Sequence, residues 1–205
     1  GHLDFLSETY EAWGCTETVM IGDLVDNTAL SFHLKNPRLK DPMREYDKAR
    51  KDIDKLTARF PKATMLMGNH DANPYRWCME VGIPEEFMRS PKDLWGLPDQ
   101  WKVVERFGQH MIDDVIYQHG DRGRASALLN AKDEFKSCVQ GHHHSKAGVQ
   151  FFANKHTRIF GMQVGCLVDH KSLCQDYGKK YTSKPILGCG VVLQGTTPIF
   201  EPWLI

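Results

Sequence analysis

Four short polar clusters, each at the end of an apolar run, constrain the fold of this chain more than any other feature. They occupy residues 22–26 (Gly-Asp-Leu-Val-Asp), 68–71 (Gly-Asn-His-Asp), 118–121 (Gln-His-Gly-Asp) and 141–144 (Gly-His-His-His). Short apolar runs that end in turn-forming residues are typical of buried strands. Open α/β sheets bind ligands beside the carboxyl ends of their strands. The pattern therefore predicts a metal site assembled at several strand ends.

The first half of the chain alternates predicted strands and helices. Apolar residues recur at three- and four-residue steps from Leu3 to Trp13, which indicates an amphipathic helix with Gly14 as its cap. We expect buried strands at 18–21 and 63–67, a long polar helix at 43–60, and a loop at 27–42.

Residues 72–101 contain four prolines and three tryptophans but no sustained period, and we interpret them as an insertion near the site. The aromatic side chains of this segment are Tyr75, Trp77, Trp95 and Trp101. They either line a substrate pocket or pack the segment onto its own core, and the second arrangement is commoner.

The second half of the chain is richer in predicted strands. Residues 102–107 and 111–117 are expected to pair, residues 124–135 to form a helix, and residues 137–140 to form a strand before the histidines. Further strands are expected at 149–153, 157–164, 186–193 and 198–204. Strands that alternate with helices, followed by a run of strands, indicate two packed sheets with helices outside. A length of 205 residues is consistent with one domain over residues 1–205.

The charges of the chain balance, with 26 basic and 26 acidic residues, so no whole-molecule field favours nucleic acid or an anionic membrane. Residues 35–62 are a local exception, with ten basic residues against five acidic ones. This excess could contact phosphates. Because the two signs are interleaved, a solvated helix face is the favoured interpretation.

The cysteine pattern and the hydropathy indicate a cytoplasmic protein. Six cysteines form no Cys-x-x-Cys pair, so reduced thiols are expected, and the alternative is a bridge among Cys166, Cys174 and Cys189. No apolar stretch approaches the roughly 18 residues of a membrane span, and the N-terminal residues lack the pattern of a signal peptide. We therefore expect no membrane partner.

The residue types in the four clusters favour hydrolysis over redox chemistry. Asp, Asn and His supply oxygen and nitrogen ligands that suit Mn²⁺, Fe or Zn²⁺, and no cysteine among them demands a softer metal. A carboxylate can bridge two ions about 4 Å apart, and such a pair stabilises both oxygens of a phosphoryl displacement while lowering the pKa of a bridging water.

The order and spacing of the clusters resemble those of the calcineurin-like metallophosphoesterases. The matching elements are Gly-Asp-x-x-Asp at 22–26, Gly-Asn-His-Asp at 68–71, His-Gly at 119–120 and Gly-His-x-His at 141–144. Each element alone is weak, but four in register are specific, and together they cover nearly the whole chain. The resemblance implies a four-layer α-β-β-α sandwich of two mixed β-sheets flanked by helices.

The resemblance also implies a role for each matched residue. Asp23 would bridge two metal ions, His144 would bind one of them, and the other would be completed by Asn69, His119 and His142. His70 would protonate the leaving oxygen or stabilise the transferring phosphoryl group, and Asp26 would orient the His70 ring. Asp71 is expected to be structural, and His143 to point away from the metals.

Simpler interpretations apply to several of these residues when they are taken singly. An aspartate after a strand, such as Asp26 or Asp71, is often only a cap or a turn former. A lone histidine is more often a surface or core residue than a ligand. For this reason the predicted site leaves out His33, His110, His156 and His170.

One element of the family pattern has no counterpart here. Relatives begin with Asp-x-His at the end of a first strand, which supplies two ligands to the ion that His144 would bind, and this sequence contains no such motif. Either that first strand is missing from the given sequence, or Gly1-His2 is a cloning remnant and the motif was lost. We expect two divalent ions, most simply Mn²⁺ with Fe, Zn²⁺ or Ni²⁺ as alternatives, and weak binding of the second.

These observations predict a metal-dependent phosphoesterase that hydrolyses phosphate mono- or diesters by attack of a metal-bound hydroxide. A nuclease that uses the basic segment 35–62 is an alternative. A third is a scaffold that kept the fold and lost efficient catalysis. In the protein-phosphatase branch of the family Arg-Gly follows Gly-Asp-x-x-Asp, whereas Asn27-Thr28 stands here, so that branch is disfavoured.

Overall fold

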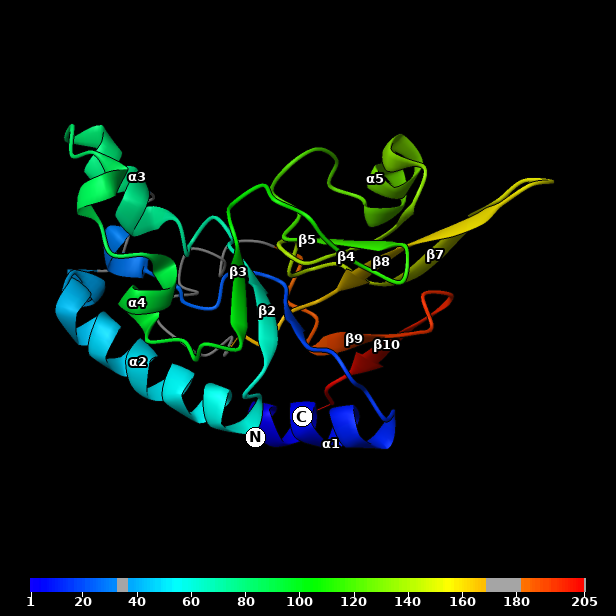
Figure 1. Ribbon diagram of the computed structural model, residues 1–205, viewed down its shortest axis with the longest axis horizontal. Helices are drawn as coiled ribbons and strands as arrows, with labels where there is room; N and C mark the ends of the chain where they lie inside the picture. Colours follow the sequence, from blue (N-terminus) through cyan, green and yellow to red (C-terminus); the bar gives the residue numbers. More distant parts are fainter. Residues whose placement is uncertain (33–36, 169–181, 205) are drawn as a thin grey trace. The chain divides into compact units, whose positions relative to one another are not determined.

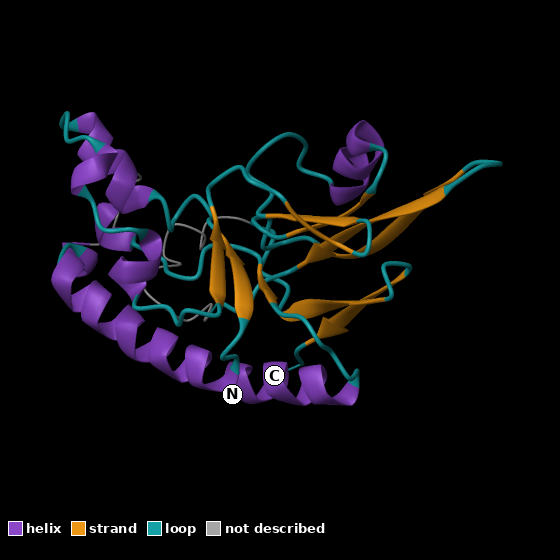
Figure 2. Ribbon diagram, viewed as in Figure 1, coloured by secondary structure: helices purple, strands orange, loops and turns teal. Residues whose placement is uncertain are grey.

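The chain is a mixed α/β protein. The computed structural model describes residues 1–32, 37–168 and 182–204 (Figure 1). These residues form a parallel three-stranded sheet, a mixed five-stranded sheet, a small hairpin and five α-helices (Figure 2). They divide into two compact units. We call residues 17–106 the parallel-sheet unit, and the mixed-sheet unit comprises 1–16, 107–168 and 183–204.

The parallel-sheet unit is built on three strands in the order β1-β2-β3, all parallel. They are β1 (Val19–Met20), β2 (Ala63–Leu66) and β3 (Trp101–Val104). Parallel neighbours need a crossover connection, and helices supply both of them: α2 (Pro42–Arg59), then α3 (Asn73–Glu80) and α4 (Pro91–Trp95). The central strand β2 is buried along its whole length, as its unbroken apolar run predicts. The expectation that both sheets are mixed is wrong for this one.

Residues 72–101 are more regular than the sequence suggested. Besides α3 and α4 they contain a 3₁₀ helix, η3 (Glu85–Phe87), and they form the crossover from β2 to β3. Trp95 and Trp101 are each only 2% exposed, and Trp101 Nε1 donates a hydrogen bond to the Phe60 carbonyl oxygen at 2.8 Å. These two aromatic side chains therefore pack the crossover onto the core of the unit.

The predicted pairing of residues 102–107 with 111–117 is wrong. Strand β3 pairs in parallel with β2, whereas β5 (Val115–Gln118) pairs with β4 (His110–Ile112) in a hairpin. The turn of this hairpin is Asp113-Asp114, and both residues have left-handed backbone angles (φ 49° and 62°). Such a two-residue turn matches the twist of antiparallel strands, and aspartate tolerates the left-handed region.

Two further segments of the parallel-sheet unit differ in detail from the expectation. The first strand is shorter than residues 18–21, since β1 has two residues and both are half-buried. The expected loop at 27–42 contains two 3₁₀ helices, η1 (Thr28–Leu30) and η2 (Pro37–Leu39). The long polar helix is confirmed as α2, which begins after the cap residue Asp41.

The mixed-sheet unit holds five strands in the order β4-β5-β6-β8-β7. The other three are β6 (Ser137–Gln140), β7 (Ala147–Ala153) and β8 (Arg158–Val164). The inner strands β5, β6 and β8 are parallel, and each edge strand is antiparallel to its neighbour. Helix α5 (Ala127–Glu134) contacts this sheet so closely that its backbone fills the space beside Gly161.

A hairpin of β9 (Gly188–Leu193) and β10 (Thr197–Pro202) completes the mixed-sheet unit, together with α1 (His2–Ala12). Helix α1 packs against the end of the hairpin, where Phe5 stacks on Trp203 and Trp13 Nε1 donates to Glu201 at 2.9 Å. The predicted helix and its end at a left-handed Gly14 are confirmed.

No helix in the described part of the chain is long and apolar enough to cross a bilayer. The described cysteines, Cys15, Cys78, Cys138, Cys166 and Cys189, are all free thiols. A bridge between Cys166 and Cys189 is therefore excluded in this structure. Cys174, like His33 and His170, lies outside the described residues.

Candidate metal centre

His119 and His142 follow two neighbouring parallel strands of the mixed-sheet unit. Strand β5 ends at Gln118 and β6 at Gln140, and these two residues are register partners. The Gly141 N–H donates to the His119 carbonyl oxygen at 2.9 Å, which extends the ladder beyond the strands. The two imidazole rings have centroids 5.1 Å apart and planes at 71°. Parallel pairing thus places two imidazoles side by side at the same end of neighbouring strands.

A row of buried glutamines lies directly before these histidines. Gln118, Gln140 and Gln163 are register partners across β5, β6 and β8, and none is more than 7% exposed. Gln118 Nε2 donates to Gln140 Oε1 at 3.2 Å, and Gln163 Nε2 donates to the Gly141 carbonyl oxygen at 2.7 Å. Buried hydrogen-bonded networks hold a unique arrangement, so this row positions the backbone that carries His142. This row was not predicted from the sequence, and its only signal there is that glutamine is the last residue of both β5 and β6.

Asn130 on α5 connects the two histidine loops. Its Oδ1 accepts from the Arg124 N–H at 2.9 Å, and its Nδ2 donates to the Arg124 carbonyl at 2.8 Å. The same Nδ2 donates to Gln140 Oε1 at 2.6 Å. Because Arg124 belongs to the loop after His119 and Gln140 precedes His142, one buried amide holds both loops together.

In the parallel-sheet unit, Asp23 and His70 also follow neighbouring parallel strands. Asp23 comes after β1 and His70 after β2, and the His70 N–H donates to Asp23 Oδ1 at 2.8 Å. This bond orients the carboxylate. Asn69, beside His70, is half-buried in the same loop.

Asp71 organises both loops of this unit. Its carboxylate is buried and accepts from the N–H groups of Asp23 and Gly68 at 2.8 Å and of Val25 at 3.3 Å. Burial and the nearby charge of Asp23 raise the pKa of Asp71 to about 6, although the three N–H donors oppose the shift. The expectation that Asp71 is structural is confirmed.

The ring of His70 is held by the main chain. His70 Nδ1 lies 2.6 Å from the carbonyl oxygen of Asp26. A carbonyl only accepts, so Nδ1 carries a proton in this contact. The resemblance implied that Asp26 orients this ring through its side chain, whereas the contact in the structure is with the Asp26 backbone oxygen. The next residue, Asn27, has a left-handed conformation (φ 43°) and donates from Nδ2 to the His70 carbonyl at 2.9 Å.

Asp26→Ala is therefore expected to leave the His70 ring in the same tautomer, with a stability change within about 0.5 kcal/mol. Asn27→Ala is the contrasting variant, since it removes a hydrogen bond of about 1 kcal/mol and a residue that tolerates the left-handed region. Nitrogen-15 NMR of the histidine rings measures the tautomer. Loss of the Nδ1-protonated form in Asp26→Ala would show that the carboxylate is required.

Asp23 and His142 each have a strained backbone conformation. Both have positive φ angles, 56° and 63°, which are uncommon for residues other than glycine. Such conformations persist where the surrounding structure enforces them, and they cluster at functional sites. Two of the sequence-predicted ligands are thus among the strained positions.

His119 and His142 of the mixed-sheet unit offer two imidazoles, and Asp23 of the parallel-sheet unit offers a carboxylate. His119 is buried and the other two are half-buried. This donor set suits Mn²⁺, Fe or Zn²⁺. His144 is half-buried and accepts a hydrogen bond from the Ile186 N–H at its carbonyl oxygen. The roles of His144 and Asn69 toward a metal remain predictions.

His143 lies between the two predicted ligands of its loop. Its ring centroid is 4.8 Å from that of His142. Partial burial lowers the pKa of His143, and the charges of Lys146, His119 and His144 lower it further. The expected orientation of His143 away from the metals stays a prediction.

Comparison with known proteins adds no family assignment: no protein-family model matches the sequence, and no curated protein matches it. The function of this chain is therefore inferred from its residues and their arrangement.

Proposed function

We propose that this chain is a metal-dependent phosphoesterase of the calcineurin-like type, which hydrolyses phosphate mono- or diesters at a dinuclear site. The observation that carries the proposal is that His119 and His142, two residues that the family motifs assign to a metal, follow neighbouring parallel strands and have ring centroids 5.1 Å apart. The same resemblance implies a four-layer α-β-β-α sandwich. The free thiols agree with a cytoplasmic location.

In this proposal Asp23 would serve both ions, Asn69, His119 and His142 would hold one of them, and His144 would hold the other. The bound ions would polarise a phosphoryl oxygen and lower the pKa of a water molecule. The donor set fits this task because it holds only oxygen and nitrogen ligands. The hydrogen bond from His70 N–H keeps the Asp23 carboxylate in one orientation.

His70 would donate a proton to the leaving oxygen. The contact with the Asp26 carbonyl assigns the Nδ1 proton, so the second proton of the imidazolium is on Nε2. That proton is the one available for transfer to an alkoxide. After transfer the ring keeps its Nδ1 proton and therefore its orientation.

Mn²⁺ binding by isothermal titration calorimetry is the direct test. We expect one tight equivalent per chain and a weaker second one, since only Asp23 and His144 are assigned to the second ion. Asp23→Ala and His142→Ala are each expected to weaken the tight site by more than the roughly 10- to 100-fold that loss of an outer-shell partner causes. Removal of the metal by a chelator should abolish hydrolysis of bis(p-nitrophenyl) phosphate.

His156→Ala is the matched control, because His156 is an exposed histidine in the turn between β7 and β8. It should bind Mn²⁺ like the unaltered chain. His70→Ala should keep Mn²⁺ binding and lose hydrolysis. Tight Mn²⁺ binding without any hydrolysis would favour the scaffold alternative, and absence of Mn²⁺ binding would contradict the metal site itself.

A further inference from the structure

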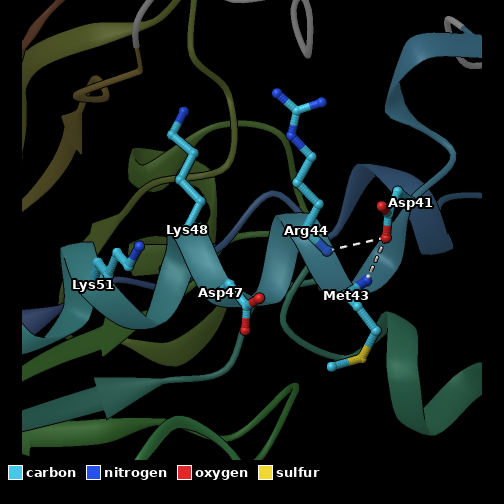
Figure 3. Close-up of a pocket in the computed structure, with 6 residues that line it drawn as sticks. All are labelled: Asp41, Met43, Arg44, Asp47, Lys48 and Lys51. Atoms are coloured by element: carbon cyan, nitrogen blue, oxygen red, sulfur yellow. Dashed lines mark hydrogen bonds between the residues drawn. The ribbon is translucent and has the colours of Figure 1, made fainter.

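Three cations form an exposed row on one face of α2. Arg44, Lys48 and Lys51 are four and three residues apart, a spacing that puts side chains on the same helix face. Figure 3 shows the side chains of Arg44 and Lys48 extended on the same side of the helix. The row borders an open hollow of about 610 Å³, whose other lining residues are Asp41, Met43 and Asp47.

The acidic residues interleaved with this row are mostly engaged elsewhere. The Glu45 carboxylate accepts from the N–H groups of Thr28 and Ala29 at 2.7 and 2.8 Å. Asp41 caps the helix by accepting from the N–H groups of Met43 and Arg44. Two more pair with basic residues of the same helix, Asp52 with Lys55 and Asp54 with Arg50.

Within the described residues, Arg44, Lys48 and Lys51 themselves make no ion pair. Charges that alternate in the sequence are thus separated in the structure. Apart from Asp47, the carboxylates serve the helix cap, η1 and neighbouring cations, and among the described residues no carboxylate forms an ion pair with the three cations of this face.

We propose that this row binds the phosphodiester backbone of a nucleic acid strand. Arg44 and Lys51 are about 10 Å apart along the helix axis at 1.5 Å per residue, so the row presents its charges in a line, as a strand presents its phosphates. A membrane-binding helix would carry an apolar face beside its cations, whereas Met43 is the one apolar residue that lines the hollow. The inference concerns binding and does not rest on the proposed metal chemistry.

The row is also connected to the loop that holds His70. Glu45, next to Arg44, binds the backbone of η1, and η1 follows Asn27. Asn27 in turn donates to the His70 carbonyl oxygen. A nucleic acid strand bound along α2 would therefore lie on the helix that supports the His70 loop through η1.

The test is fluorescence anisotropy with a short fluorescein-labelled DNA strand, in EDTA so that no hydrolysis occurs. The double variant Lys48→Gln/Lys51→Gln is expected to weaken binding about 25-fold near 0.1 M salt. Each phosphate contact on a single strand contributes about 0.7 to the slope of log K against log salt, and the variant removes two such contacts. The slope of log K against log salt should become shallower by about 1.4. Asp47→Asn should tighten binding, since it removes the carboxylate that borders the row.

Lys55→Gln/Lys62→Gln is the matched control. It removes the same charge from the same unit, but Lys55 pairs with Asp52 at 2.9 Å and Lys62 with Glu17 at 3.1 Å. A larger loss of affinity in the row variant than in this control supports the proposal. Equal losses in both, or no DNA binding by the unaltered chain, would overturn it. Binding to phosphatidylserine vesicles without binding to DNA would also overturn it, in favour of a membrane surface.

Discussion

Asp71→Ala is expected to destabilise the parallel-sheet unit by about 3 kcal/mol or more, because a buried donor left without a partner costs about 1–3 kcal/mol. Three N–H groups lose their acceptor in this variant, those of Asp23, Val25 and Gly68. Two of them belong to the loop that carries Asp23. Urea unfolding measures the stability, and Mn²⁺ titration should show weaker binding even where the variant is still folded.

Asp99→Ala is the control for this prediction. The Asp99 side chain is fully exposed and pairs with Lys92 at 3.5 Å, so its loss should change stability by no more than about 0.5 kcal/mol. The stability of Asp71→Asn should lie between those of Asp71→Ala and Asp99→Ala. The amide keeps one acceptor oxygen but turns its N–H₂ group toward a backbone N–H donor. Wild-type stability of Asp71→Ala would show that water replaces the carboxylate at no cost.

Gly161→Ala is expected to destabilise the mixed-sheet unit by more than about 3 kcal/mol, beyond the usual range for an overpacked core. A Cβ at this position would lie 2.1 Å from the backbone nitrogen of Leu128 and 2.4 Å from the carbonyl carbon of Ala127. These are backbone atoms of α5, so relief requires the whole helix to move away from β8. Circular dichroism during urea unfolding, or loss of soluble protein, reports the effect.

Gly190→Ala separates this backbone clash from ordinary crowding. Its Cβ would meet the ends of two side chains, Met162 Cε at 2.7 Å and Val164 Cγ1 at 2.8 Å. The flexible methionine can turn aside, so a loss of about 1–3 kcal/mol is expected. If Gly161→Ala is no worse than Gly190→Ala, then α5 adjusts more freely than its contact with β8 indicates.

Several elements were predictable from local pattern alone. The apolar run at 63–67 and the short strand predicted at 137–140 form β2 and β6, and every residue of both strands is buried. The helix at 43–60 forms because Asp41 caps its start, Pro42 is compatible with its first turn, and its polar face tolerates water. In these cases interactions between residues a few positions apart in the sequence decide the conformation.

Strand pairing was not predictable in the same way. Residues 102–107 and 111–117 are close in sequence and both carry strand-forming residues, which suggested a hairpin. The structure pairs β3 with β2 and gives β5 a different partner, β4. Pairing depends on which apolar faces meet across the core, and no local pattern carries that information.

For the candidate site, the sequence by itself predicted which polar residues follow strands. Such residues are candidates for a site because α/β sheets bind ligands beside the carboxyl ends of their strands. Only the tertiary structure decided how they are held. The backbone oxygen of Asp26 orients His70, the carboxylate of Asp71 fixes the Asp23 loop, and the glutamine row supports His142. The charge row of α2 likewise emerged only when its carboxylates found partners in the fold. The contacts of His70 with Asp26, of Asp71 with Asp23, of Gln163 with Gly141 and of Glu45 with η1 join residues distant in the chain, so their geometry depends on folding of the whole unit.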